Sequence, residues 1–98
     1  MLKTFRERLV WLRSVSGALT LSQMSILAGL SRNHLGLLES GQRYDPDTTT
    51  IEELARVYGV SMDWLWRGIG NVPSPEHVRT SVLGAQKRGT KRNRRAAA

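Results

Sequence analysis

The sequence predicts an all-α protein of five short helices followed by a basic C-terminal extension. Apolar residues recur every three or four positions in five successive stretches, which is the spacing of one helix face. Most stretches begin beside a serine, threonine or aspartate that can cap a helix, and each is followed by a glycine that can end one. No stretch alternates apolar and polar residues as a half-buried strand does. The length of 98 residues fits one small domain.

The first helix is predicted over residues 3–16. Phe5, Leu9 and Leu12 follow one another at i, i+4 and i+7, so they lie on one face, and charged residues occupy much of the rest. Gly17 follows directly and is suited to the left-handed conformation in which many helices end.

The second helix is predicted over about residues 20–28. The letters TLSQ place Thr20 at the N-cap and Gln23 at the third helical position, which is the pattern of a capping box. Gly29 ends this helix after a body of only eight residues.

The third helix, over about residues 31–40, begins after the short turn GLS. Ser31 is its expected N-cap. Leu35 and Leu38 are spaced i and i+3, so we expect both side chains to face the protein interior. Gly41 ends the helix.

A turn-rich stretch, YDPDTTT, separates the third helix from the fourth. Asp47 or a neighbouring threonine is the expected cap of the fourth helix, and Gly59 ends it. Its apolar face holds Ile51, Leu54, Ala55 and Tyr58. The fifth helix is the segment SMDWLWRG, with Ser61 as its cap and Gly68 as its stop.

The chain divides into a globular part, residues 1–70, and a C-terminal extension, residues 71–98. The extension begins with two prolines, and we expect a short helix from Pro75 through Val82. Beyond Gly84 the sequence is basic and poor in hydrophobic residues, which predicts disorder.

Positive charge is concentrated in that extension. Residues 84–98 carry six of the 15 lysines and arginines and no acidic residue, whereas the remainder of the chain is nearly neutral. The six are Lys87, Arg88, Lys91, Arg92, Arg94 and Arg95. A basic tail of this kind favours a polyanionic partner, most often nucleic acid. The alternative is a solubilising tail without a specific role.

Composition argues against several classes of protein. The chain has no cysteine, which excludes disulfides and thiolate metal sites and fits a reducing cytoplasm. Its two histidines, His34 and His77, are far apart in sequence and have no carboxylate arrangement nearby, so we expect no metal, cofactor or enzymatic activity. No apolar run approaches the roughly 18 residues of a membrane-spanning helix, and no signal peptide is evident.

Two short helices joined by a tight, glycine-containing turn form the pattern of a helix-turn-helix unit. In such a unit the second helix enters the DNA major groove, and its first turn meets the base edges. Arg32 can donate two hydrogen bonds to guanine, Asn33 can pair with adenine, and Leu37 can lie against a thymine methyl. The alternative is that Arg32 and Asn33 form only a solvated helix face.

The segment GLSRNHLGLLESGQR resembles the turn and recognition helix of the XRE family, the Cro and phage-repressor-like helix-turn-helix proteins. The resemblance extends from Phe5 to Gly68 and rests on the ordered set GLSRN, LESGQR, ELARVYGVS and DWLWRG. It implies a five-helix, lambda-repressor-like fold, sequence-specific binding to double-stranded DNA, and binding as a homodimer.

The resemblance places the base-reading positions of the family on Arg32, Asn33 and Leu37. The residues that we expect to contact DNA phosphates are Thr20, Ser31, His34, Gln42 and Arg43. Of these, Gln42 and Arg43 match the loop that contacts phosphates in the family.

The resemblance also pairs Arg13 with Glu39, which in relatives links the first helix to the end of the third. We therefore expect an ion pair between these two side chains. If it is partly buried, breaking it would leave an unpaired charge at a cost of several kcal/mol.

The sequence departs from the family pattern at several positions, two of which bear on function. Leu21 stands where the family often has a glutamine that binds a phosphate. Ile26 and Leu27 stand where relatives usually carry charge, so they are a candidate surface for a protein partner. Gly36 lies in the middle of the third helix, toward its expected outer face, where it either lets the backbone approach DNA closely or is simply tolerated.

The sequence therefore predicts a cytoplasmic, sequence-specific DNA-binding transcriptional regulator, of the repressor type, that reads the major groove with its third helix. One alternative is an antitoxin-type DNA-binding partner of a toxin. Another is a protein-interaction module that has lost DNA reading, for which Leu21 is the best support.

Overall fold

The computed structural model describes residues 2–17, 19–41 and 45–97, with side chains through residue 88. Its elements are α1 (Phe5–Ser14), α2 (Leu21–Ala28), α3 (Arg32–Ser40), α4 (Thr48–Tyr58), a π-helical turn η1 (Asp63–Arg67) and α5 (Pro75–Ala97). The described residues contain no strand, so the predicted all-α class is confirmed.

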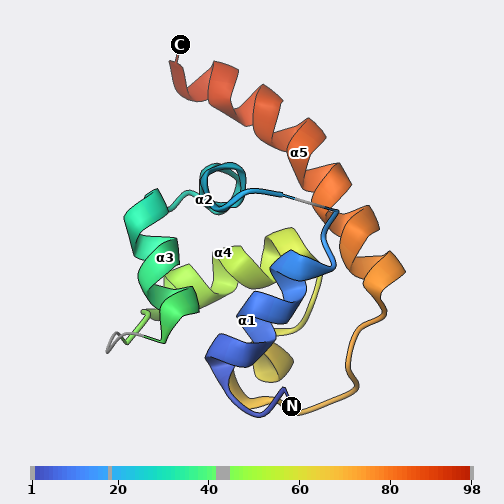
Figure 1. The fold of residues 1–98 in the computed structure, drawn as a ribbon. Helices are drawn as coiled ribbons and strands as arrows, with labels where there is room; N and C mark the ends of the chain where they lie inside the picture. Colours follow the sequence, from blue (N-terminus) through green and yellow to red (C-terminus); the bar gives the residue numbers. More distant parts are fainter. Residues whose placement is uncertain (1, 18, 42–44, 98) are drawn as a thin grey trace.

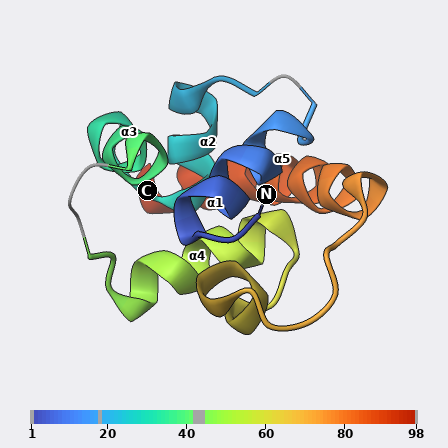
Figure 2. The same ribbon diagram turned by 60° about the horizontal axis from the view of Figure 1, so that its bottom comes forward.

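The helices surround one hydrophobic core. In both ribbon views α3 lies on one side and the beginning of α5 on the opposite side, with α1 and α4 between them (Figures 1 and 2). The fully buried large side chains come from all of these elements and include Leu9, Leu12, Met24, Leu35, Leu54, Val57, Tyr58, Leu65, Val78 and Val82. The same core therefore holds the helix-turn-helix unit and the C-terminal helix.

Capping residues fix where the first two helices begin. The predicted capping box of α2 is present: the Gln23 backbone N–H donates to Thr20 Oγ1 at 3.1 Å, and the Thr20 N–H donates to Gln23 Oε1 at 2.9 Å. A second capping box, between Thr4 and Glu7, starts α1 two residues later than the sequence predicted. These bonds satisfy backbone N–H groups that a helix leaves open at its start.

The expected fifth helix is a single π-helical turn, η1, which buries Trp64 and Leu65. Its last carbonyl groups are bound by Arg8, which reaches across from α1. The Arg8 guanidinium donates to the carbonyl oxygens of Leu65 and Trp66, both at 2.9 Å, and to that of Leu2 at 3.0 Å. Arg8 is thus 2% exposed without a carboxylate partner, because three backbone oxygens accept its hydrogen bonds.

Helix α5 is much longer than the sequence predicted. It continues past Val82 and is helical through Ala97, so the expected end at Val82 is wrong, and the backbone is helical where disorder was expected beyond Gly84. The continuation past Val82 has a reason in packing, since Val78, Val82 and Ala85 repeat at i, i+4 and i+7 and are all buried. That stripe is hard to see in the sequence because charged and polar residues fill the positions between its members.

Two side chains of α5 also bind the open C-terminal end of α4. Ser81 Oγ donates to the Val57 carbonyl at 3.0 Å, and His77 Nε2 lies 2.7 Å from the Gly59 carbonyl oxygen. The last carbonyl groups of a helix have no partner within the helix, so these contacts satisfy two of them. The division of the chain at residue 70 stays a prediction, but the first turns of α5 pack on the same core as α4.

Candidate nucleic-acid interface

The turn between α2 and α3 is short because one glycine takes a left-handed conformation. Gly29 has φ +71°, and the Leu30 backbone N–H then donates to the Ser25 carbonyl at 2.9 Å. Nothing lies within 4 Å of where a Cβ on Gly29 would be, so the residue is required by its backbone angle and not by crowding. Ser31 then caps α3, accepting the His34 backbone N–H at 3.0 Å. Two residues thus separate the end of α2 from the cap of α3.

Helix α3 presents two distinct faces. Leu35 and Leu38 are buried, as the sequence predicted, and hold the helix on the core. Arg32 and Asn33, in its first turn, are exposed, and Leu37 is half-buried. The predicted base-reading side chains therefore do not contribute to the core, and two of the three are fully available to a ligand.

The predicted phosphate-contacting residues occupy different environments. The hydroxyl oxygens of Thr20 and Ser31 each accept a backbone N–H, which leaves their O–H groups able to donate to an anion. His34 is half-buried. The pKa of Asp47, which caps α4, is lowered chiefly by its hydrogen bond with the Thr50 backbone N–H.

The other two predicted phosphate contacts, Gln42 and Arg43, lie outside the described residues. They follow Gly41, which ends α3 in a left-handed conformation with φ +79°.

An ion pair joins α1 to the end of α3, between Arg13 and Glu39. Arg13 Nε lies 2.9 Å from both carboxylate oxygens of Glu39, and Arg13 Nη1 donates to the Leu19 carbonyl at 3.1 Å. Burial raises the pKa of Glu39, and the hydrogen bond from Arg13 opposes that rise. The pair fixes the last turn of α3 against the helix beneath it.

The buried hydroxyl of Tyr58 lies within the electrostatic reach of this pair. Burial, and secondarily the charge of Glu39, raises the pKa of Tyr58 above its ordinary value. Tyr58 Oη finds no hydrogen-bond partner among the described residues. It is therefore a polar group that the core tolerates at a cost in stability.

Gly36, expected toward the outer face of α3, is half-buried and lies beside the start of α2. A Cβ built on Gly36 would lie 3.4 Å from Leu21 Cδ2, which places this side of α3 against the first residue of α2. Leu21, one of the departures from the family pattern, thus lies against Gly36. The leucine at position 21 covers the glycine, so the two helices approach closely at the point where α2 begins.

Sequence reasoning did not find the role of Arg8 in binding the end of η1. A signal was present, because Arg8 is adjacent to Leu9 and one turn from Leu12, both buried. An arginine that close to an apolar stripe either extends its head group to solvent or finds acceptors inside the protein.

Comparison with known proteins identifies the family. The model of a family described as helix-turn-helix matches residues 17–65, which is half of the chain and includes α2, its turn and α3. The chain belongs to this XRE-type helix-turn-helix family. No solved structure matches the chain.

One curated helix-turn-helix relative is similar in sequence. It is the uncharacterized HTH-type transcriptional regulator RghRB of Bacillus subtilis (strain 168), which is 32% identical over 69 residues. The match covers 69% of this chain and 50% of the relative, so the chain spans about half the length of the curated protein that it matches.

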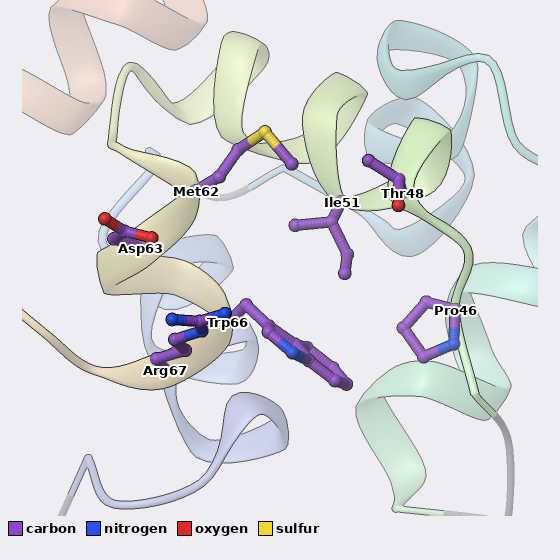
Figure 3. Close-up of a pocket in the computed structure, with 7 residues that line it drawn as sticks. All are labelled: Pro46, Thr48, Ile51, Met62, Asp63, Trp66 and Arg67. Carbon is purple, nitrogen blue, oxygen red and sulfur yellow. The ribbon is translucent and has the colours of Figure 1, made fainter.

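A separate cavity of about 330 Å³ lies between the start of α4 and η1. It is lined by Pro46, Thr48, Ile51, Met62, Asp63, Trp66 and Arg67 (Figure 3). In this view the indole of Trp66 lies below Ile51 and to the left of Pro46, and its ring meets that of Phe5 edge-on at 5.1 Å. Trp66 is nevertheless 42% exposed, so it is a surface side chain with one packed side.

No helix in the described part of the chain is both long enough and apolar enough to cross a membrane.

Proposed function

We propose that this protein is a sequence-specific DNA-binding transcriptional regulator of the repressor type, without catalytic activity. The observation that carries the proposal is the division of α3, in which Arg32 and Asn33 are exposed while Leu35 and Leu38 anchor the helix. Guanidinium and carboxamide groups are suited to guanine and adenine edges in the major groove, and a half-buried Leu37 can meet a thymine methyl. Membership of the helix-turn-helix family supports this assignment.

Phosphate contacts orient the reading helix on the duplex in this proposal. Thr20 and Ser31 have hydroxyl hydrogens to donate at the starts of α2 and α3. We assign the same role to His34, Gln42 and Arg43. A regulator held in this way blocks transcription by occupying its operator. Because the ligand is DNA, we place the protein in the cytoplasm.

We further propose that the protein binds DNA as a homodimer, with one half-site for each subunit. Exposed apolar side chains support this: Trp66, Ile69 and Val72 are between 42% and 57% exposed within one short segment of sequence. Large exposed apolar side chains are candidates for burial in an interface. Two recognition helices in such a dimer would lie roughly 34 Å apart, one turn of DNA.

Selection of bound sequences from random duplex DNA tests the proposal. Wild type should select a short palindromic motif, and Arg32→Ala/Asn33→Ala should lose preference at particular positions of that motif, because each good bidentate contact discriminates by about 1–3 kcal/mol. Arg79→Ala, which removes an exposed charge on α5, should select the wild-type motif. If wild type enriches no motif, operator reading is wrong.

Ile26 favours a second candidate, in which the chain also binds a protein, as an antitoxin does. Its side chain is 64% exposed on the outer side of α2. The same selection distinguishes the alternatives, because an antitoxin-type regulator would still enrich a motif. A protein-interaction module that has lost DNA reading would enrich none.

A further inference from the structure

Helix α1 carries three arginines, at positions 6, 8 and 13, and two of them have structural partners. Arg8 is buried on backbone carbonyls of the N-terminal segment and η1. Arg13 is held by Glu39 and by the Leu19 carbonyl. The hydrogen-bonding capacity of these two guanidinium groups is thus directed into the protein.

Arg6 differs from both. It is exposed, and no ion pair or side-chain hydrogen bond among the described residues includes it. Two acids of α1 and α3 are already engaged: Glu7, next to Arg6 in sequence, accepts the backbone N–H groups of Lys3 and Thr4, and Glu39 accepts Arg13. The guanidinium of Arg6 therefore keeps its five donors for an external ligand.

The stem of Arg6 is nevertheless held in a defined place. It crosses Gly41, the residue that ends α3, so closely that a Cβ on Gly41 would lie 2.6 Å from Arg6 Cδ and 2.9 Å from Arg6 Nε. Figure 1 shows the first turn of α1 beside the end of α3, and Figure 2 shows the same neighbourhood from another side. Gly41 thus leaves room for Arg6, in addition to taking a positive φ.

We propose that Arg6 is a phosphate-contacting residue of the DNA interface. The proposal rests on the function proposed above, since it places this guanidinium at the end of the helix that reads the operator. A guanidinium binds a phosphate through two parallel N–H···O bonds, and such contacts position a protein without reading sequence. Arg6 adds to the interface a contact from α1, outside the helix-turn-helix unit itself.

The salt dependence of DNA binding tests this assignment. Affinities of wild type, Arg6→Gln and Arg6→Lys are measured over a series of salt concentrations, on an operator selected by wild type and on an unrelated duplex. Arg6→Gln should reduce the slope of log affinity against log salt by about 1 and weaken both duplexes alike, because one phosphate contact is lost. Arg6→Lys keeps the charge and should keep the slope.

Arg79→Gln is the matched control. Arg79 is also exposed and without a described partner, but it lies near the start of α5, on the opposite side of the molecule from α3 (Figure 1). The Arg79→Gln variant should therefore leave the slope of log affinity against log salt unchanged. A fall in slope that is equal for Arg6→Gln and Arg79→Gln would reflect net charge alone and would overturn the proposal.

A second pair of variants tests whether Gly41 is what places Arg6. Gly41→Ala and Gly17→Ala impose the same kind of strain, since both glycines have positive φ, but nothing lies within 4 Å of the Gly17 position. Only Gly41→Ala should reduce the slope, and adding Arg6→Gln to it should cause no further reduction.

The outcomes separate the two proposals. An unchanged slope for Arg6→Gln, with wild type binding DNA normally, would overturn the role of Arg6 and leave the regulator intact. Loss of thermal stability in Arg6→Gln with an unchanged slope would mean that Arg6 only stabilises the end of α3, and would also overturn it. Absence of duplex binding by wild type would overturn both.

Discussion

At the scale of single residues, the fold depends on arginines whose partners differ. Arg13 is paired with a carboxylate, Arg8 with carbonyl oxygens, and Arg6 with neither. The resemblance to known regulators predicted the Arg13–Glu39 pair because both residues occupy matched positions. It did not predict the role of Arg8, because the acceptors of Arg8 are backbone carbonyl groups of a distant turn, which the sequence alone does not place beside α1.

Arg13→Gln should lower the free energy of unfolding by about 1–3 kcal/mol at neutral pH, because it leaves the buried carboxylate of Glu39 without its charged partner. We place the effect below that of a fully buried pair because Arg13 is 30% exposed. Urea denaturation measures the change. Glu53→Gln is the control: Glu53 pairs with Arg56 on the surface, so its loss should change stability by about 0.5 kcal/mol or less.

The Glu39 contribution also depends on pH. Burial raises its pKa in the folded state above the ordinary value of 4.5, so the folded protein binds this proton more tightly than the unfolded chain does. The contribution of Glu39 to the free energy of unfolding therefore rises as pH falls toward that ordinary value of 4.5, and it declines as pH rises. Wild type should therefore gain stability relative to Glu39→Gln, which has no carboxyl at this position, as pH is lowered from neutral toward 4.5. A loss of stability of wild type relative to Glu39→Gln over this range would contradict the assigned direction.

At the scale of elements, the starts and stops of α2, α3 and α4 could be predicted because local chemistry determines them. Thr20 and Ser31 cap the helices that they were expected to cap, and Gly29 and Gly59 end theirs in the left-handed conformation. What could not be predicted depends on packing between elements. The turn η1 is π-helical, and its carbonyl groups bind Arg8. Gly36 lies against Leu21 of α2. Helix α5 continues past Val82 because widely spaced small apolar residues pack on the core.

Val82→Ala should lower the free energy of unfolding by about 1.5–3 kcal/mol, because it removes two buried methyl-sized groups and leaves a cavity. Val82 is 1% exposed, whereas its neighbour Leu83 is 54% exposed. Leu83→Ala is therefore the control and should change stability by about 0.5 kcal/mol or less. Chemical denaturation of both variants measures whether α5 unfolds together with the rest of the domain. Equal effects of the two variants would mean that α5 is not docked.

At the scale of the whole molecule, most of the basic residues and the buried apolar residues occupy different parts of α5. Among the side chains that the structure describes, the last apolar residue that docks the helix is Ala85, whereas four of the basic residues lie beyond Gly89. Charge can therefore be removed from the end of the chain without removing a residue of the described core. The candidate base readers, in contrast, lie on α3, in the middle of the sequence and at the opposite side from the beginning of α5 (Figure 2).

Deletion of residues 89–98 should weaken binding to all duplexes alike and flatten the salt dependence, while the selected motif stays the same. The reason is that positive charge attracts the DNA backbone without reading bases. Salt titrations on operator and unrelated duplexes, together with repeated selection, measure both properties. If the motif changes when this segment is removed, the division of labour between α3 and the basic segment is wrong.

The position of Arg8 bears on the order in which the protein folds. Its acceptors at Leu65 and Trp66 lie 57 and 58 residues away in sequence, so a single side chain closes a loop that contains α2, α3 and α4. Such a distant contact is entropically expensive and forms late. During synthesis, therefore, Arg8 can bind these two carbonyl groups only after the chain has been made as far as Trp66. Helix α3 is therefore held on a complete domain only after α1 and η1 have come into contact.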